Sequence, residues 1–233
     1  MANPEPGKSS SSPSARITSL STEGADGSVL RVRLDDGSLF LFDDPSAVRT
    51  AREFRDTGDP VPPDLMANFA AADEVYRCRR KAMDLLARAE QCRKGLEAKL
   101  AKKGFSREAA AAALDRLESV GFLDDRRFAE AWVRSRLRSR PEGPSRIIAG
   151  LMAKGIAPGA AREAAESVFA EAGGGEAAER ETLERAREKL LRRRGMDEEK
   201  LTAALLRRGF SYSAVRAASQ RREDGGDPES RRD

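Results

Sequence analysis

The chain of 233 residues has no histidine and only two cysteines, Cys78 and Cys92. Histidine is the commonest general base near neutral pH, so its absence argues against an enzyme that works by acid–base chemistry. Two cysteines without histidine cannot complete the four-ligand set of a structural zinc site, and their spacing matches no metal or redox motif. We therefore expect no cofactor and no metal, and we expect both cysteines to be reduced side chains in helices.

Aromatic residues make up only 5% of the chain, and no apolar run approaches the roughly 18 residues that span a bilayer. Hydrophobic residues amount to 39% against 35% charged residues, a small apolar supply for one large core. This composition suits an array of small helical units that each bury one apolar stripe. The N-terminus also lacks the basic and apolar regions of a secretory signal, so we expect a cytoplasmic protein without membrane contact.

Charge is distributed unevenly along the chain, although the net charge is only +4. Acidic residues outnumber basic ones in residues 1–73, whereas basic residues outnumber acidic ones in residues 74–222. A basic body favours an anionic partner, such as nucleic acid or an acidic protein groove. Two alternatives stay open: the excess of arginine over lysine can reflect the base composition of the coding DNA, and the charges can lie on solvated helix faces.

The first 63 residues predict a tail followed by a small β element. Residues 1–14 are rich in Pro, Ser and Gly and should be disordered. Residues 29–34 alternate apolar and basic side chains, and residues 35–38 (Asp-Asp-Gly-Ser) form a favourable hairpin turn into residues 39–42. We predict two or three strands in a hairpin-containing segment, residues 15–63.

From about residue 64 the pattern is helical, and one motif occurs three times, at residues 100–106, 151–157 and 205–211. Each copy reads Leu, two variable residues, a basic residue, Gly, an apolar residue and a small residue. Glycine suits the left-handed position after a helix, and the basic residue suits the negative end of the helix. The motif therefore predicts a helix stop and restart at Gly104, Gly155 and Gly209.

Around each stop there is room for three helices. The predicted helices are 74–90, 92–103 and 106–120, then 124–139, 144–154 and 158–171, then 176–194, 197–208 and 211–222. The predicted fold is all-α, with three tandem three-helix repeat units in an elongated curved array and a small N-terminal β-hairpin element. The predicted domains are a tail (1–14), the hairpin segment (15–63), three helical units (64–121, 122–172 and 173–222) and a disordered tail (223–233).

The stretch from Gly121 to Ala129 predicts entry into a helix. Asp124 is placed as the N-cap with Asp125 in the first turn, which leaves Arg126 and Arg127 exposed and available to a partner. Adjacent helix residues point apart and no nucleophile or further ligand is evident, so neither catalysis nor metal binding is expected of the two aspartates. Phe128 and Trp132 are four residues apart, which favours core packing over stacking on nucleic acid bases.

The ordered set of these motifs resembles the RecX family. The family signature Gly-Phe/Tyr-Leu/Ile-Asp-Asp-x-x-Phe-Ala matches residues 121–129. Its Leu-x-x-Lys-Gly-Ile motif matches residues 151–156, and its Gly-x-x-Arg-Ile motif matches residues 143–147. The resemblance covers about residues 74–220. The N-terminal segment is variable or missing in many relatives and the third unit matches less well, so no role is carried over to either.

The resemblance implies a function. Members of this family modulate the RecA recombinase, typically by restraining it, and bind in the groove or at the growing end of the RecA–DNA filament. It implies a non-enzymatic, monomeric regulator in DNA repair, recombination and the SOS response, with the RecA filament as its partner. The alternative is a helical protein that binds single- or double-stranded DNA directly, without RecA. No motif supports an enzyme.

The candidate partner-binding residues are basic. The arginine runs at 134–140 and 192–194 are candidates for contact with phosphate or an acidic groove. The alternative that stays open is that they only form a solvated surface. The cations of the stop motifs either form a line of positive charge or only complement helix C-termini, an effect of about 0.3–1 kcal/mol each. The candidate set is Lys102, Lys103, Arg126, Arg127, Arg134, Arg136, Arg138, Arg140, Arg146, Lys154, Arg192, Arg193, Arg194, Arg207 and Arg208, with Gly104, Gly121, Asp124, Asp125, Phe128, Gly155 and Gly209 as structural motif residues.

Overall fold

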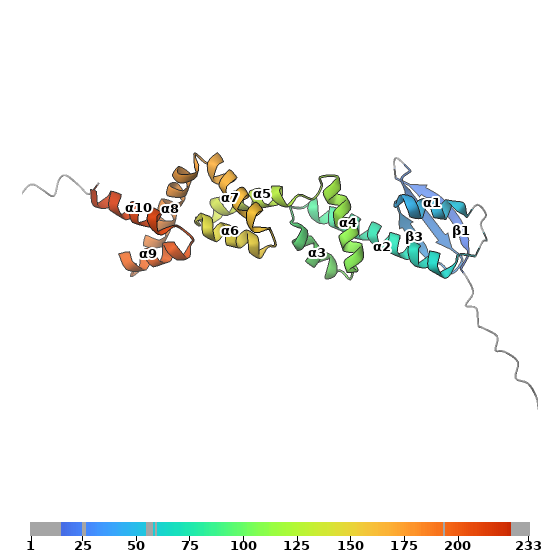
Figure 1. The fold of residues 1–233 in the computed structure, drawn as a ribbon. Helices are drawn as coiled ribbons and strands as arrows, with labels where there is room; N and C mark the ends of the chain where they lie inside the picture. Colours follow the sequence, from blue (N-terminus) through green and yellow to red (C-terminus); the bar gives the residue numbers. More distant parts are fainter. Residues whose placement is uncertain (1–14, 25–26, 55–57, 59, 193, 225–233) are drawn as a thin grey trace, which may run out of the picture. The chain divides into compact units, whose positions relative to one another are not determined.

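The computed structural model describes residues 15–24, 27–54, 58, 60–192 and 194–224 (Figure 1). These residues form ten helices and one three-stranded sheet, which confirms the predicted helical fold with a small N-terminal β element. The chain divides into two compact units, one containing residues up to 85 with 97–120, the other containing 86–96 with the residues from 121 onward. The predicted tails, 1–14 and 223–233, lie outside the described residues, except for 223 and 224 at the end of the last helix.

The N-terminal β element is a three-stranded antiparallel sheet rather than a single hairpin. Strands β1 (Ile17–Glu23), β2 (Val29–Leu34) and β3 (Leu39–Phe42) are paired in the order β1-β2-β3. The turn between β2 and β3 is the predicted one, with Gly37 at a φ of +88°. Alternation along β2 buries Leu30 and Val32 on one face, while Arg33 points to the other and is exposed.

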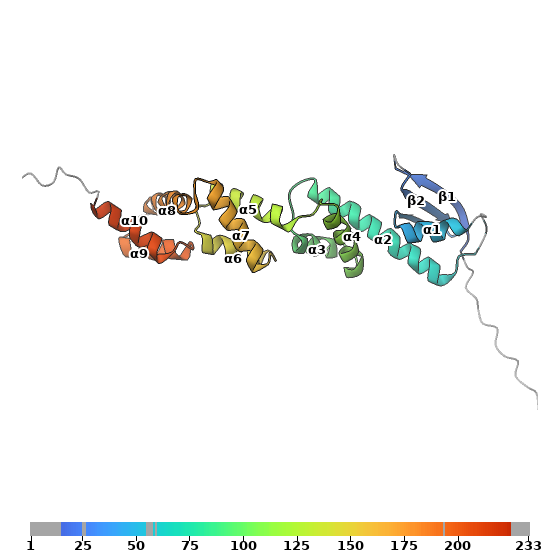
Figure 2. The same ribbon diagram turned by 45° about the horizontal axis from the view of Figure 1, so that its top comes forward.

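A helix that the sequence analysis did not predict covers the buried face of the sheet (Figure 2). This helix, α1 (Pro45–Glu53), begins at Asp44, whose side chain accepts the backbone N–H groups of Ser46 and Ala47. An aspartate N-cap followed by proline at the first helical position is a recognised helix start, so the signal was present in the sequence. Ala51 of α1 is completely buried in the core of the sheet.

Helix α2 (Pro63–Leu86) begins eleven residues before the predicted start at residue 74. Its first turns carry Leu65 and Phe69 into the core of the sheet, where the Phe69 ring stacks on that of Phe42 at a centroid distance of 5.3 Å. Its later turns bury Cys78 and Ala82. One continuous helix therefore serves both the β element and the first helical repeat.

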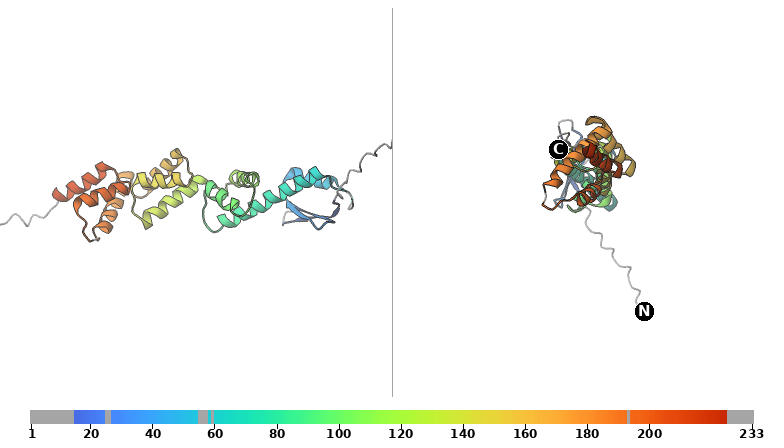
Figure 3. Two further views of the ribbon diagram at one scale, coloured as in Figure 1. Left: turned by 90° about the horizontal axis from the view of Figure 1, so that it is seen from below. Right: turned by 90° about the vertical axis from the view of Figure 1, so that its left-hand side faces the viewer.

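The remaining eight helices follow the predicted three-fold repeat closely (Figure 3). The first repeat is completed by α3 and α4, the second consists of α5, α6 and α7, and the third consists of α8, α9 and α10. Their bounds are α3 (Arg93–Ala101), α4 (Arg107–Ser119), α5 (Asp125–Ser139), α6 (Pro144–Ala153), α7 (Pro158–Glu171), α8 (Gly175–Leu191), α9 (Glu198–Arg207) and α10 (Tyr212–Asp224).

The three helix stops share one backbone geometry. Gly104, Gly155 and Gly209 have φ values of +86°, +98° and +85°, which lie in the left-handed region that favours glycine. The residue after each glycine donates its backbone N–H to the leucine that opens the motif, for example Phe105 to the carbonyl of Leu100 at 3.3 Å. These bonds satisfy carbonyl groups that a helix end would otherwise leave unpaired.

Candidate partner-binding surface

Two stop glycines also lie in tight joints between consecutive repeats. At the joint of the second and third repeats, Gly143 donates its backbone N–H to the carbonyl of Arg208 at 2.8 Å. A Cβ on Gly143 would lie 2.3 Å from the carbonyl oxygen of Gly209, and a Cβ on Gly209 would lie 2.3 Å from the backbone nitrogen of Arg146. Glycine at both positions is what lets the two backbones approach this closely.

The joint between the first and second repeats has the same layout but uses side chains. The Cys92 Sγ, at the start of α3, donates to the carbonyl of Lys154 at 3.4 Å. The aliphatic chain of Lys94 lies over Gly155, where an added Cβ would be 2.3 Å from the Lys94 Cδ. In both joints the start of one repeat's second helix packs on the stop of the next. This contact explains why residues 86–96 belong to the same compact unit as the second repeat.

The two aspartates at the start of α5 tie helix ends together. Asp124 accepts the backbone N–H groups of Arg126 and Arg127, as an N-cap does. Asp125 instead accepts the backbone N–H of Arg93 at 2.7 Å, and so caps α3. Arg127 is fully engaged, because it pairs with Glu90 at 2.6 Å and donates to two backbone carbonyls in the turn before α5. Arg127 therefore stabilises the local fold, whereas Arg126 makes one ion pair within its own helix, with Glu130 at 3.2 Å.

The arginines at the C-terminal end of α5 lie on two different stripes of the helix, since residues two apart point to opposite sides. Arg134 and Arg138 share one stripe and Arg136 lies on the other, whereas Arg140 follows the helix as its C-cap, with extended dihedral angles. Arg134 pairs with Glu171 of α7 at 2.9 Å, and Arg136 pairs with Glu142 at 2.8 Å. Arg138 and Arg140 are exposed, and no ion pair is found for either one among the described residues.

Trp132 lies one turn before Arg136 and packs with Phe128 against the core of the second repeat. Its ring covers Gly150 of α6, where a Cβ would come within 2.6 Å of the indole. The guanidinium carbon of Arg136 lies 5.2 Å from the ring centroid, and the Lys154 ammonium nitrogen lies 5.8 Å from it. Two cations are thus held at one aromatic ring by cation–π attraction.

On the other stripe, Arg134 and Arg138 line a groove of about 380 Å³ between α5, α7 and α8. Arg185 of α8, which no sequence motif singles out, lies at the same groove and donates a hydrogen bond to the carbonyl of Leu137. Glu171, which neutralises Arg134, was also not predicted, because it reaches Arg134 from a different helix. The groove has an apolar floor that includes Leu137, Val168, Ala172 and Ala178.

Most of the other candidate cations lie at the C-terminal ends of helices, where they complement the negative pole, whereas Arg146 lies in the first turn of α6, at the positive pole. Arg208 is half-buried at the joint with Gly143, and Arg193 lies outside the described residues. The exposed members are Lys102, Lys103, Arg146, Lys154, Arg192, Arg194 and Arg207.

The described residues contain no group of three or more side chains that could hold a metal ion. In the same part of the chain, no helix is both long enough and apolar enough to cross a membrane. The chemistry on the surface of the second repeat is therefore that of guanidinium, carboxylate and indole groups, which can bind a partner through charge and stacking.

Two family profiles match the helical part of the chain. Residues 78–117 match the first three-helix domain of RecX, and residues 124–164 match the second. The chain is 36% identical over 145 residues to regulatory protein RecX of Treponema pallidum, covering 62% of this chain and 85% of the relative. It is 38% identical over 161 residues to regulatory protein RecX of Halorhodospira halophila, covering 66% of this chain and 92% of the relative.

Solved structures agree on the fold. A crystal structure of regulatory protein RecX superposes with a TM-score of 0.67 at 21% identity, covering 87% of this chain and 97% of that one. The crystal structure of RecX from Lactobacillus salivarius gives a TM-score of 0.55 at 24% identity, covering 64% of this chain and 97% of the other. The repeat motifs, the two matched domains and the similarity over most of the relatives' length lead to one conclusion: this chain belongs to the RecX family.

Proposed function

We propose that this protein is a non-enzymatic regulator that restrains the RecA recombinase by binding the RecA–DNA filament, in its groove or at its end. The observation that carries the proposal is the similarity to proteins named regulatory protein RecX over most of their length. RecA acts on DNA, so we also place the protein in the cytoplasm.

The arginine-bearing face of α5 and its neighbours is the proposed contact surface. Arg138 and Arg140 support this assignment, because both are exposed and neither has an ion-pair partner among the described residues. An unpaired exposed guanidinium can bind phosphate or carboxylate in a bidentate manner without first breaking an internal contact. A RecA–DNA filament offers both phosphates and protein carboxylates to such a surface.

The proposal is tested with the purified full chain, RecA, single-stranded DNA and ATP. We expect the rate of ATP hydrolysis by RecA, and the yield of strand exchange, to fall as the protein is added at ratios up to one per RecA. A pull-down of filaments should retain the protein. If neither rate nor yield changes at equimolar protein, the proposal is wrong.

Direct binding to DNA is the second candidate function, and the exposed cations Arg138, Arg140 and Lys154 favour it, since such groups bind phosphate. The dependence of binding affinity on salt concentration distinguishes this function from the first. Binding dominated by phosphate contacts weakens steeply as salt concentration rises, because bound counterions are released. Tight, salt-sensitive binding to DNA combined with no effect on RecA would favour this function over the first.

A further inference from the structure

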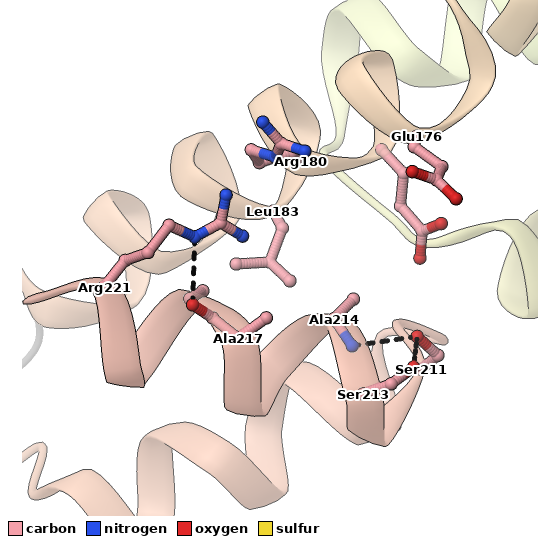
Figure 4. Close-up of a pocket in the computed structure, with 10 residues that line it drawn as sticks. Glu176, Arg180, Leu183, Ser211, Ser213, Ala214, Ala217 and Arg221 are labelled. Atoms are coloured by element: carbon pink, nitrogen blue, oxygen red, sulfur yellow. Dashed lines mark hydrogen bonds between the residues drawn. The ribbon is translucent and has the colours of Figure 1, made fainter.

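The third repeat contains a groove that no part of the proposed function uses. The groove lies between α8 and α10 and has a volume of about 270 Å³ (Figure 4). We call it the α8–α10 groove. It is lined by Glu176, Glu179, Arg180, Leu183, Ser211, Ser213, Ala214, Ala217, Ala218 and Arg221.

The third repeat differs from the second at several core positions, and one of them lies at the groove. When Gly155 and Gly209 are aligned, Leu183 of α8 occupies the place of Ala129 of α5. Both side chains are buried. The larger Leu183 lines the groove but is only 1% exposed, so a bound segment would meet the half-buried Ala214 and Ala217 rather than Leu183.

Two guanidinium groups lie at this space. Arg180 and Arg221 are both exposed, and no carboxylate pairs with either of them in the described part of the chain. Arg221 donates from Nε to the carbonyl of Ala217 at 3.0 Å, in its own helix, which leaves its two terminal nitrogens available. Figure 4 shows both guanidinium groups on one side of the groove, close to Leu183.

A third arginine adds buried positive charge on the same stripe of α8. Arg187 follows Leu183 by one turn and is only 6% exposed. One of its terminal nitrogens lies 3.5 Å from a Glu198 carboxylate oxygen, while Nε and the other terminal nitrogen have no hydrogen-bond partner among the described residues. This guanidinium already faces the Glu198 carboxylate and does not line the groove, so it offers no direct contact to a bound segment. At the equivalent position the second repeat has the apolar Val133.

The other end of the groove is acidic. Glu176 and Glu179 lie there, and Figure 4 shows Glu176 on the far side from Arg221. Burial raises the pKa of Glu179, opposed by the hydrogen bond from the backbone N–H of Ser211. Two carboxylates repel a continuous polyanion such as a nucleic acid backbone. Between the two charged ends, the half-buried Ala214 and Ala217 offer a small apolar floor.

We propose that the α8–α10 groove binds a segment of a partner protein in which an acidic side chain and a basic side chain flank an aliphatic one. The acidic side chain meets Arg180 and Arg221, the aliphatic one covers Ala214 and Ala217, and the basic one meets Glu176. A pair of guanidinium groups recognises a carboxylate through charge-assisted hydrogen bonds. The opposed charges at the two ends also set the direction in which the segment binds.

The test uses a phage-displayed library of random heptapeptides, selected against the full chain. We expect the selected peptides to be enriched in the order acidic, aliphatic, basic. Amide chemical-shift changes on adding a selected synthetic peptide should map to α8 and α10. In the double variant Arg180→Glu/Arg221→Glu, affinity for that peptide should fall at least about tenfold, as expected for the loss of charged hydrogen bonds.

The matched control is Arg216→Glu, which changes an exposed arginine of α10 that does not line the groove and should leave peptide affinity unchanged. Circular dichroism checks that every variant keeps its helicity. The proposal is overturned if selection yields no charge pattern, or if the double variant binds the peptide as well as the wild-type chain does. Shift changes at this groove with a single-stranded oligonucleotide, but with no peptide, would overturn it as well.

Discussion

At the scale of single residues, the three stop glycines are alike in backbone conformation and different in surroundings. All three have φ near +90°, yet only two are crowded. A Cβ at Gly104 would meet nothing within 4 Å, one at Gly155 would meet the flexible side chain of Lys94, and one at Gly209 would meet the backbone of Arg146. The same motif in the sequence therefore has three different tolerances to substitution.

We predict that replacing these glycines with asparagine, which tolerates a positive φ, destabilises the protein in the order Gly104, Gly155, Gly209. Gly104→Asn should cost about 1 kcal/mol, since only the backbone conformation is affected. Gly209→Asn should cost about 3 kcal/mol, because the joint with α6 must open. Denaturant unfolding followed by circular dichroism measures the series. Equal costs at Gly104 and Gly209 would contradict the close joint.

A buried thiol links stability to pH. Burial raises the pKa of Cys78 to about 11 from its ordinary value of 9.0, with a smaller contribution from the charge of Glu74. Because the folded protein holds this proton more tightly than the unfolded chain does, the stability that the thiol contributes is complete below pH 9 and is lost between pH 9 and about 11.

We therefore expect the wild-type chain to lose more stability between pH 8.5 and 10.5 than the variant Cys78→Ala does. The unfolding midpoint in denaturant at the two pH values checks this. The same burial should protect the thiol from alkylation at pH 8 until the protein is unfolded. A pH dependence identical in the two proteins would mean that Cys78 ionises as easily in the folded state as in the unfolded chain.

At the scale of helices, the third helix of each repeat starts at an equivalent position, with a serine cap in the first and third repeats and none in the second. In the first repeat the Ser106 hydroxyl accepts the N–H of Ala109, while Glu74 accepts both the hydroxyl and the backbone N–H of Ser106, at 2.8 and 2.7 Å. The backbone bond is the main cause that lowers the pKa of Glu74. In the second repeat the N-cap of α7 is Ala157, which has no side-chain bond.

Supplying the missing cap should stabilise α7. Ala157 is exposed and has extended dihedral angles, with φ −60° and ψ 145°, so a serine fits without strain. We predict that Ala157→Ser raises the free energy of unfolding by about 0.5–1 kcal/mol, whereas Ser106→Ala lowers it by about 1 kcal/mol. Thermal unfolding of both variants measures the difference. A loss of stability in Ala157→Ser would show that the position is constrained by something besides capping.

The helices themselves could largely be predicted from the sequence, and the two misses have physical causes. Helix α1 is short and carries Ala51 into a core formed mostly by strands, so its apolar stripe is hard to separate from loop sequence. The start of α2 was missed because its first turns bury Leu65 and Phe69 against the sheet rather than against other helices. A helix whose two halves face different cores has no single apolar period to detect.

At the scale of the whole molecule, binding of an anionic partner depends less on the net charge of the chain than on which cationic side chains remain unpaired. Arg134 and Arg136 are held by Glu171 and Glu142, whereas Arg138 and Arg140 are exposed with no ion pair found in the described residues. The four arginines look equivalent in the sequence. In the structure, two of them link secondary-structure elements and two are available to a partner.

Charge reversal should separate these two roles. We predict that Arg138→Glu/Arg140→Glu leaves the melting temperature nearly unchanged and weakens binding to RecA–DNA filaments roughly tenfold at low salt. Arg134→Glu/Arg136→Glu should instead lower the melting temperature, because Glu171 and Glu142 then face a like charge. Filament pull-down and thermal unfolding together measure both effects. Wild-type binding by the first variant would place the contact surface elsewhere.

The sequence alone determined the features that depend on neighbouring residues in the chain. The stop glycines, the Asp124 cap, the β2–β3 turn and the three-helix repeat follow from backbone dihedral preferences, capping and apolar period, which act over a few residues. The tertiary structure decided which faces meet. It paired Arg134 with Glu171, brought Gly143 against Gly209 while leaving Gly104 open, and left a groove between α8 and α10. Such contacts join residues far apart in the chain and depend on side-chain volume across a packed interface, which no local pattern encodes.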